Sequence, residues 1–156
     1  ENAPLIHSIL ADEKNKGLSS LEPYRAFAQR ISLQRENIIE LVRKINGRGQ
    51  KIFGYGASTK GNVILQYCSF TSKDIPFIAE VNSDKFGRFT PGTGIPIISE
   101  QQAKDMKPDY LLVLPWHFKD NIVQREKAYL ESGGALVFPL PRIEIVTQQT
   151  PDASAL

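Results

Sequence analysis

Four short apolar runs, separated by turns and by stretches with helical periodicity, are the feature that most constrains the fold of this chain. They lie at residues 51–55, 76–81, 110–114 and 135–138. Runs of this length between Gly, Pro and polar residues are typical of buried strands. Strands that alternate with helices form βαβ units with right-handed crossovers and a parallel sheet. The sequence therefore predicts the α/β class, as a Rossmann-like three-layer domain with a mostly parallel sheet.

A long N-terminal helix is expected before this sheet, over about residues 22–46. Its apolar residues recur at helical spacing and would share one face. These residues are Phe27, Ile31, Ile38, Val42 and Ile45. Pro23 suits the first turn of such a helix and Gly47 suits its end.

Further elements are expected between and after the later strands. Ser99 followed by Gln102 resembles a capping box, which predicts a short helix to about Met106. A longer helix is predicted over residues 118–130, where apolar residues again recur at helical spacing. Residues 143–146 are predicted to form an edge strand.

The composition sets limits on the class of protein. The 156 residues suit one domain at 22–146, preceded by a linker remnant at 1–21 and followed by a frayed tail at 147–156. The balance of 19 basic and 17 acidic residues is too weak to indicate a nucleic-acid partner. No apolar run approaches the ~20 residues of a membrane span, and the two histidines and single cysteine form no metal motif. We therefore expect a cytoplasmic protein without a membrane or nucleic-acid partner and without a metal site.

The strongest candidate site is the loop between the first apolar run and the next helix. It consists of Gly54, Tyr55, Gly56, Ala57, Ser58, Thr59, Lys60, Gly61 and Asn62. Free backbone N–H groups and the dipole at a helix start attract a phosphate, and glycines let the backbone approach it closely. Ser58, Thr59 and Lys60 would add donors and a positive charge. The alternative is an ordinary tight turn whose glycines serve packing only.

This loop matches neither of the common nucleotide motifs. The dinucleotide fingerprint would place a glycine at Thr59 and an acid at the end of the second strand, where Glu80 stands one residue early. The phosphate-binding loop of nucleotide triphosphatases would need Lys and Ser or Thr where Asn62 and Val63 stand. An NAD- or CoA-type binding module therefore stays an alternative, as does a docking domain without a ligand.

Two further loops follow the second and third strands and are expected at the same edge of the sheet. Lys85 and Arg88 would clamp a diphosphate there, or would form a solvated basic turn. Trp116 would either stack on a base or cap the core. His117 would either donate a proton or, as is usual for a single histidine in a loop, have no catalytic role. The three loops offer donors, cations and an aromatic ring without an acid–base set. The residues therefore favour binding over catalysis.

Taken together, these motifs resemble the C-terminal domain of SAM-dependent sugar C-methyltransferases, which act on nucleotide-linked deoxysugars. Three ordered segments carry the resemblance. They are residues 52–62, Asp84-Lys85-x-Gly87-Arg88 with Pro91-Gly92-Thr93, and Asp109-Tyr110-x-x-x-Leu114-Pro115-Trp116.

The resemblance implies a substrate-binding domain whose ligand is a nucleotide-sugar, typically a dTDP-sugar. It also implies that SAM is bound by a central domain outside this chain, which would be its protein partner, so no cofactor and no catalytic residue are expected here. It places the Gly54–Asn62 loop, Lys85, Arg88 and Trp116 against the nucleotide diphosphate. His117 stands where the family more often has Asn, which argues against an essential catalytic histidine.

Overall fold

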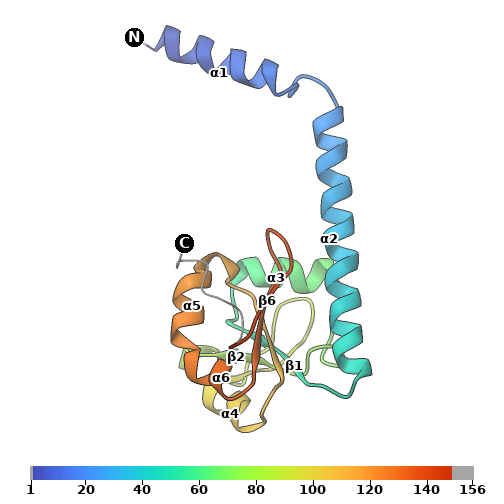
Figure 1. Ribbon diagram of the computed structural model, residues 1–156, viewed down its shortest axis with the longest axis vertical. Helices are drawn as coiled ribbons and strands as arrows, with labels where there is room; N and C mark the ends of the chain where they lie inside the picture. The colour runs from blue at the N-terminus through green and yellow to red at the C-terminus, as the bar shows by residue number, and fades with distance from the viewer. Residues whose placement is uncertain (1, 149–156) are drawn as a thin grey trace. The chain divides into compact units, whose positions relative to one another are not determined.

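The computed structural model describes residues 2–148, which belong to two compact units that divide between Arg35 and Glu36 (Figure 1). The first unit contains helix α1 (Ala3–Asn15) and the beginning of helix α2 (Glu22–Gly47). The sequence predicts α2 correctly but not α1, because residues 1–21 are predicted to be a linker remnant. A signal was present: four apolar residues in α1 recur at helical spacing. They are Leu5, Ile6, Ile9 and Leu10, all exposed.

The second unit is built on a six-stranded sheet in the order β3-β2-β1-β4-β5-β6. The strands are β1 (Ile52–Tyr55), β2 (Ile78–Glu80), β3 (Ile97–Ser99), β4 (Tyr110–Val113), β5 (Ala135–Phe138) and β6 (Glu144–Val146). All neighbours pair in parallel except β6, which runs antiparallel to β5 at the edge. The predicted α/β class, the mostly parallel sheet and the edge strand are therefore confirmed.

The helices of this unit are α3 (Thr59–Tyr67), α4 (Glu100–Asp105), α5 (Lys119–Arg125) and α6 (Lys127–Glu131). Short 3-10 turns, η1 (Ser83–Lys85) and η2 (Trp116–Phe118), follow β2 and β4. The predicted capping box of α4 is present, with Ser99 and Gln102 bonded in both directions. The single helix expected over 118–130 is wrong in detail. It breaks at Glu126, whose backbone leaves the helical region and whose side chain is buried.

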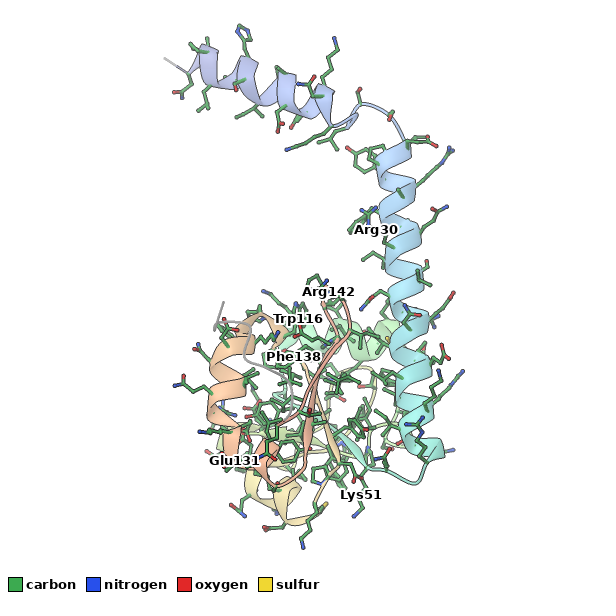
Figure 2. All side chains as sticks on the ribbon, viewed as in Figure 1. Arg30, Lys51, Trp116, Glu131, Phe138 and Arg142 are labelled. Atoms are coloured by element: carbon green, nitrogen blue, oxygen red, sulfur yellow. The ribbon has the colours of Figure 1, made fainter. Side chains whose placement is uncertain are left out.

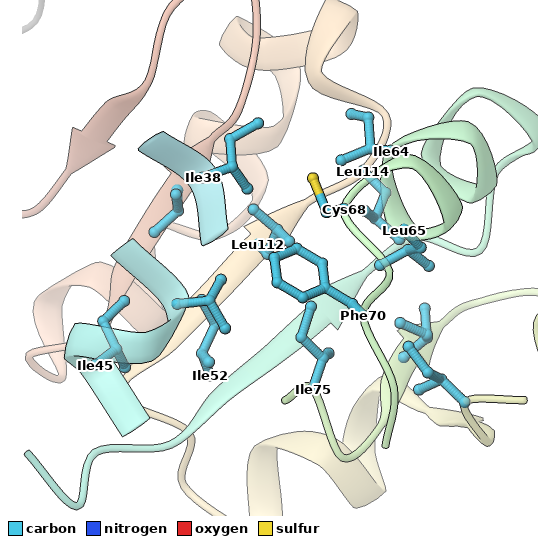
Figure 3. Close-up of a cluster of buried hydrophobic side chains, with 14 of the residues drawn as sticks. Ile38, Ile45, Ile52, Ile64, Leu65, Cys68, Phe70, Ile75, Leu112 and Leu114 are labelled. Carbon is cyan, nitrogen blue, oxygen red and sulfur yellow. The ribbon is translucent and has the colours of Figure 1, made fainter. Parts of the chain in front are cut away.

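Side chains alternate between two hydrophobic clusters, one on each face of the sheet. One face packs against the C-terminal part of α2 and against α3, as Ile38, Ile45, Ile64 and Leu112 show (Figure 3). The other packs against α4, α5 and α6. In β4, for example, Leu112 faces the first cluster and Val113 the second. Burial of both faces explains why the strands read as continuous apolar runs.

The apolar stripe of α2 is buried in one part of the helix and exposed in the other. Ile38, Val42 and Ile45 are buried within the second unit, as the periodicity predicts. Phe27 is 57% exposed and Ile31 is also exposed, so in the first unit the predicted stripe meets no core. Periodicity identifies a helix and its apolar face but not the length over which that face is covered.

The strand order reverses direction between β1 and β4, which makes their carboxyl ends the switch point of the sheet. Trp116 follows β4 and Lys51 precedes β1, so the two residues mark opposite edges of the sheet in Figure 2. Among residues 2–148, no helix is both long and apolar enough to cross a membrane.

Candidate functional site

A cavity of about 390 Å³ opens at the switch point, at the carboxyl edge of the sheet. We call it the carboxyl-edge cavity. Its walls come from residues 55–58 at and after the end of β1, from the end of β2 with Lys85, from residues after β4, and from α4 and α5. Ligands of open α/β sheets bind at this place, and the volume is within the range of small-molecule sites. The structure thus brings residues of all three predicted loops to one cavity.

Four residues of the predicted loop line this cavity: Tyr55, Gly56, Ala57 and Ser58. The other five, which are Gly54, Thr59, Lys60, Gly61 and Asn62, lie outside its lining. Thr59 and Lys60 are exposed at the first turn of α3.

The glycines of the loop have clear packing roles. A Cβ at Gly56 would lie 2.8 Å from Pro115 Cδ, and the φ of 81° at Gly56 suits only glycine. A Cβ at Gly61 would lie 2.5 Å from Cβ of Leu114, and one at Gly54 would clash with the Ile78 side chain. The loop can therefore lie directly on the ends of β2 and β4 only because these positions lack side chains.

The start of α3 retains free donors. Ser58 caps the helix, as expected, with its Oγ accepting from the Gly61 amide at 3.0 Å. The Asn62 amide donates to the Ser58 carbonyl. Within the part of the chain that the structure describes, the amides of Thr59 and Lys60 have no acceptor. These two amides and the helix dipole can attract an anion.

The Glu80 carboxylate joins the β1 loop to the end of β2. Its Oε2 accepts from the Ala57 amide at 2.9 Å and from Lys85 Nζ at 3.1 Å. Its Oε1 accepts from the amides of Val81 at 2.9 Å and Asn82 at 3.0 Å. A carboxylate offers about four acceptor positions, so all of them are engaged.

Burial tends to raise the pKa of Glu80, but the hydrogen bonds from Asn82, Lys85 and Val81 outweigh it and hold the pKa below its ordinary value. The group is therefore a charged carboxylate at neutral pH. Lys85, 40% exposed, donates to the Ala57 carbonyl at 2.9 Å as well as to Glu80. An ammonium group has three donors, so one remains for a ligand.

A network of charged residues lies at the opposite wall, which Glu100 and Arg125 line, with Glu126 and Lys104 behind them. Glu126 is 1% exposed, and its Oε1 accepts from the Tyr55 hydroxyl at 2.5 Å. Lys104 Nζ lies 2.7 Å from Glu126 Oε2, and Arg125 Nε lies 3.3 Å from Oε1. Arg125 also contacts Glu100 and the Tyr55 hydroxyl, with its guanidinium over the Tyr55 ring.

The sequence-based prediction missed Arg125, Glu100 and Glu126. A signal existed for Glu126, since it falls four residues after Ile122 and four before Leu130 on the apolar face. A charged residue at a core position indicates a buried ion pair. Burial raises the pKa of Glu100, helped by the negative charges of Glu126 and Glu80 and opposed by Lys104.

Three further predicted residues lie outside the lining of the cavity. Arg88 is exposed, and its Nε donates to the Asp84 carbonyl at 2.6 Å. Trp116 is half-buried and packs against both hydrophobic clusters, which is the capping role left open by the sequence. His117 is exposed between the rings of Trp116 and Phe118, with centroids at 5.8 and 4.2 Å.

A second, larger cavity of about 620 Å³ lies at the amino edge of the sheet, and we call it the amino-edge cavity. Lys104, Lys107 and Asp109 line it, together with Glu126 and Gly134. Arg125 lines both cavities. The amino edge is not where open α/β sheets bind their ligands.

A family model described as the C-methyltransferase C-terminal domain matches residues 1–141. The chain belongs to this family. C-methyltransferase NovU of Streptomyces niveus is 36% identical over 150 residues, which are 96% of this chain and 36% of that protein. The chain thus spans about a third of the length of this relative.

Methyltransferases generally use SAM, and Glu80 offers a SAM ribose no free acceptor position. Rossmann-type sites engage ribose hydroxyls with an acid near the end of the second strand. Glu80 is the last residue of β2 and so occupies that place, which corrects the expectation that it stands one residue early. Its acceptor positions are filled by Ala57, Val81, Asn82 and Lys85. The same observation argues against the NAD-type alternative.

Proposed function

We propose that this chain holds the nucleotide-sugar substrate of a C-methyltransferase at the carboxyl edge of its sheet. The observation that carries the proposal is the carboxyl-edge cavity, formed by the predicted glycine loop and Lys85 in a domain of a C-methyltransferase family. A dTDP-sugar is the proposed ligand, in accord with the resemblance of the loop motifs to sugar C-methyltransferases.

The diphosphate is proposed to lie at the rim of the cavity, between the start of α3 and Lys85. The free amides of Thr59 and Lys60, the Lys60 side chain and the third donor of Lys85 provide the positive potential. Asn62, Arg88, Trp116 and His117 would contact only parts of the ligand that extend beyond the cavity.

The methyl donor and the catalytic groups are proposed to belong to another part of the enzyme, because Glu80 cannot serve a SAM ribose without releasing its present partners. Purified chain should therefore transfer no methyl group from labelled SAM. Transfer by this chain alone would contradict that part of the proposal.

The binding test uses the single tryptophan, Trp116, which lies between the cavity-lining residues Pro115 and Phe118. Titration with dTDP should change its fluorescence, whereas NADH should not. Lys60→Met and Lys85→Met each remove a charge but keep an apolar stem, and each should weaken dTDP binding about tenfold, or about 1.4 kcal/mol.

The matched control is Lys127→Met on α6, an exposed lysine that lines neither cavity. Its affinity for dTDP should equal that of the wild type. Unchanged affinity in both Lys60→Met and Lys85→Met would remove the assigned site. A response to NADH in place of dTDP would replace the proposed class of ligand.

A further inference from the structure

We propose that the carboxyl-edge cavity receives an uncharged, hydroxyl-bearing ring of the ligand and excludes its diphosphate. This inference rests on the proposed function and states which part of a nucleotide-sugar enters the fold. Two rings of a nucleotide-sugar have this chemistry, the nucleoside and the hexose, and the test below distinguishes them.

The charges that line the cavity cancel one another. Lys85 is paired with Glu80 at 3.1 Å, and Arg125 is in contact with Glu100. Behind Arg125, Glu126 adds a third negative charge, which Lys104 balances from outside this cavity. A diphosphate would lose its hydration on entry and would meet no net positive charge in return.

The backbone of the loop offers no donor to an anion inside the cavity. The amides of Gly56 and Ser58 donate to the carbonyls of Ala79 and Gly56, both at 2.8 Å. The Ala57 amide donates to Glu80 at 2.9 Å. The free amides begin at Thr59, outside the lining. The position of the donors therefore separates an anion site at the rim from the interior.

Apolar side chains frame the cavity. Val81 is 61% exposed and Phe118 is 53% exposed, although apolar side chains of this size are usually buried. Pro115 and Ile122 complete the frame. Such surfaces suit the C–H face of a sugar or the face of a base, whereas phosphate oxygens would gain nothing from them.

The polar groups that line the cavity suit hydroxyls. The Glu100 carboxylate accepts hydrogen bonds, the Arg125 guanidinium donates them, and the Asn121 amide can do both. A hydroxyl both donates and accepts, so it can use all three groups. A diphosphate only accepts, and Glu100 would repel it. The Glu100 side chain is only 19% exposed, and this burial is the main cause that raises its pKa.

Glu100→Gln tests the proposal by the sign of its effect. If a hydroxylated ring enters the cavity, loss of the charged acceptor should weaken dTDP-glucose binding about five- to tenfold. If the diphosphate enters, removal of a repelling charge should tighten the binding of dTDP and of inorganic pyrophosphate. Calorimetric titration of the chain with these three ligands measures both signs.

Phe118→Ala is the second variant, because it removes an exposed apolar wall without touching the charges. It should weaken dTDP-glucose binding and leave pyrophosphate binding unchanged. The matched control is Glu131→Gln, an exposed glutamate that lines neither cavity. It should change no affinity. Thermal unfolding of each variant verifies that the fold is intact.

If Glu100→Gln and Phe118→Ala weaken the binding of dTDP and of dTDP-glucose equally, the ring in the cavity is the nucleoside. If the variants weaken the binding of dTDP-glucose alone, the ring in the cavity is the hexose. Unchanged or tighter binding of both ligands would overturn the inference while the proposed function stands. Failure of the wild-type chain to bind either ligand would overturn the proposed function, and the inference with it.

Discussion

The two cavities of the sheet domain differ in position, in size and in the way their walls are held. The amino-edge cavity is larger, about 620 Å³ against about 390 Å³, and Lys104 and Lys107 line it from α4 and the turn that follows. The carboxyl-edge cavity lies at the switch point, with a glycine loop packed against Pro115 as one wall. The candidate site is assigned by topology and not by volume, because parallel strands bring three loops to the carboxyl edge.

The two cavities share a wall, since Arg125 lines both and Glu126 lies behind it. This wall should account for the largest mutational effect. Glu126→Ala removes the acceptor of the Tyr55 hydroxyl and the buried partner of Lys104 and Arg125. We expect the free energy of unfolding to fall by about 3 kcal/mol, measured by urea denaturation.

Glu131→Ala is the control for this change, because Glu131 is exposed and pairs only loosely with Lys127. It should alter the free energy of unfolding by less than about 0.5 kcal/mol. Equal losses in the two variants would show that the buried network around Glu126 does not stabilise the fold.

The rigidity of the carboxyl-edge wall can be tested with two glycines that both have positive φ. Gly49→Ala places a Cβ in open space, so only backbone strain should act, about 1 kcal/mol. Gly56→Ala adds the clash with Pro115, and the free energy of unfolding should fall by about 2 kcal/mol more. Thermal and urea unfolding of the pair measure this excess, and equal losses would show that the loop adapts.

Glu80 should give the smallest effect, visible as a dependence on pH. Its pKa in the folded chain lies below the ordinary value of 4.5, so its contribution is present above that pH and is lost as the pH falls through the folded pKa. Glu80→Gln should therefore be less stable than the wild type by about 1 kcal/mol at pH 7. The difference should shrink as the pH is lowered from 4.5.

The control for this titration is Glu40→Gln, because the pKa of Glu40 is also lowered, by Lys44, but the group is fully exposed. Its unfolding curve should follow the wild type across the same pH range. A constant gap between wild type and Glu80→Gln at all pH values would show that the charge of Glu80 does not stabilise the loop.

Much of the fold could be predicted from the sequence. The sequence predicts β1, β2, β4, β5, β6, α2 and the capping box of α4, because apolar periodicity and capping residues are local signals. The break at Glu126 could not be, because it depends on a contact between that carboxylate and Tyr55, 71 positions away. Arg88 and Lys85 looked equivalent in the sequence, yet only Lys85 lines the cavity.

The sequence by itself determined the fold class, the loop after β1 and membership of a C-methyltransferase family, because these depend on residues close together along the chain. Only the tertiary structure decided which charged groups face one another across the cavity. Lys85 and Glu80 meet near the end of one strand, whereas Glu100 and Arg125 come from two helices. Such pairs depend on how the helices pack on the sheet, and local sequence patterns do not encode that packing.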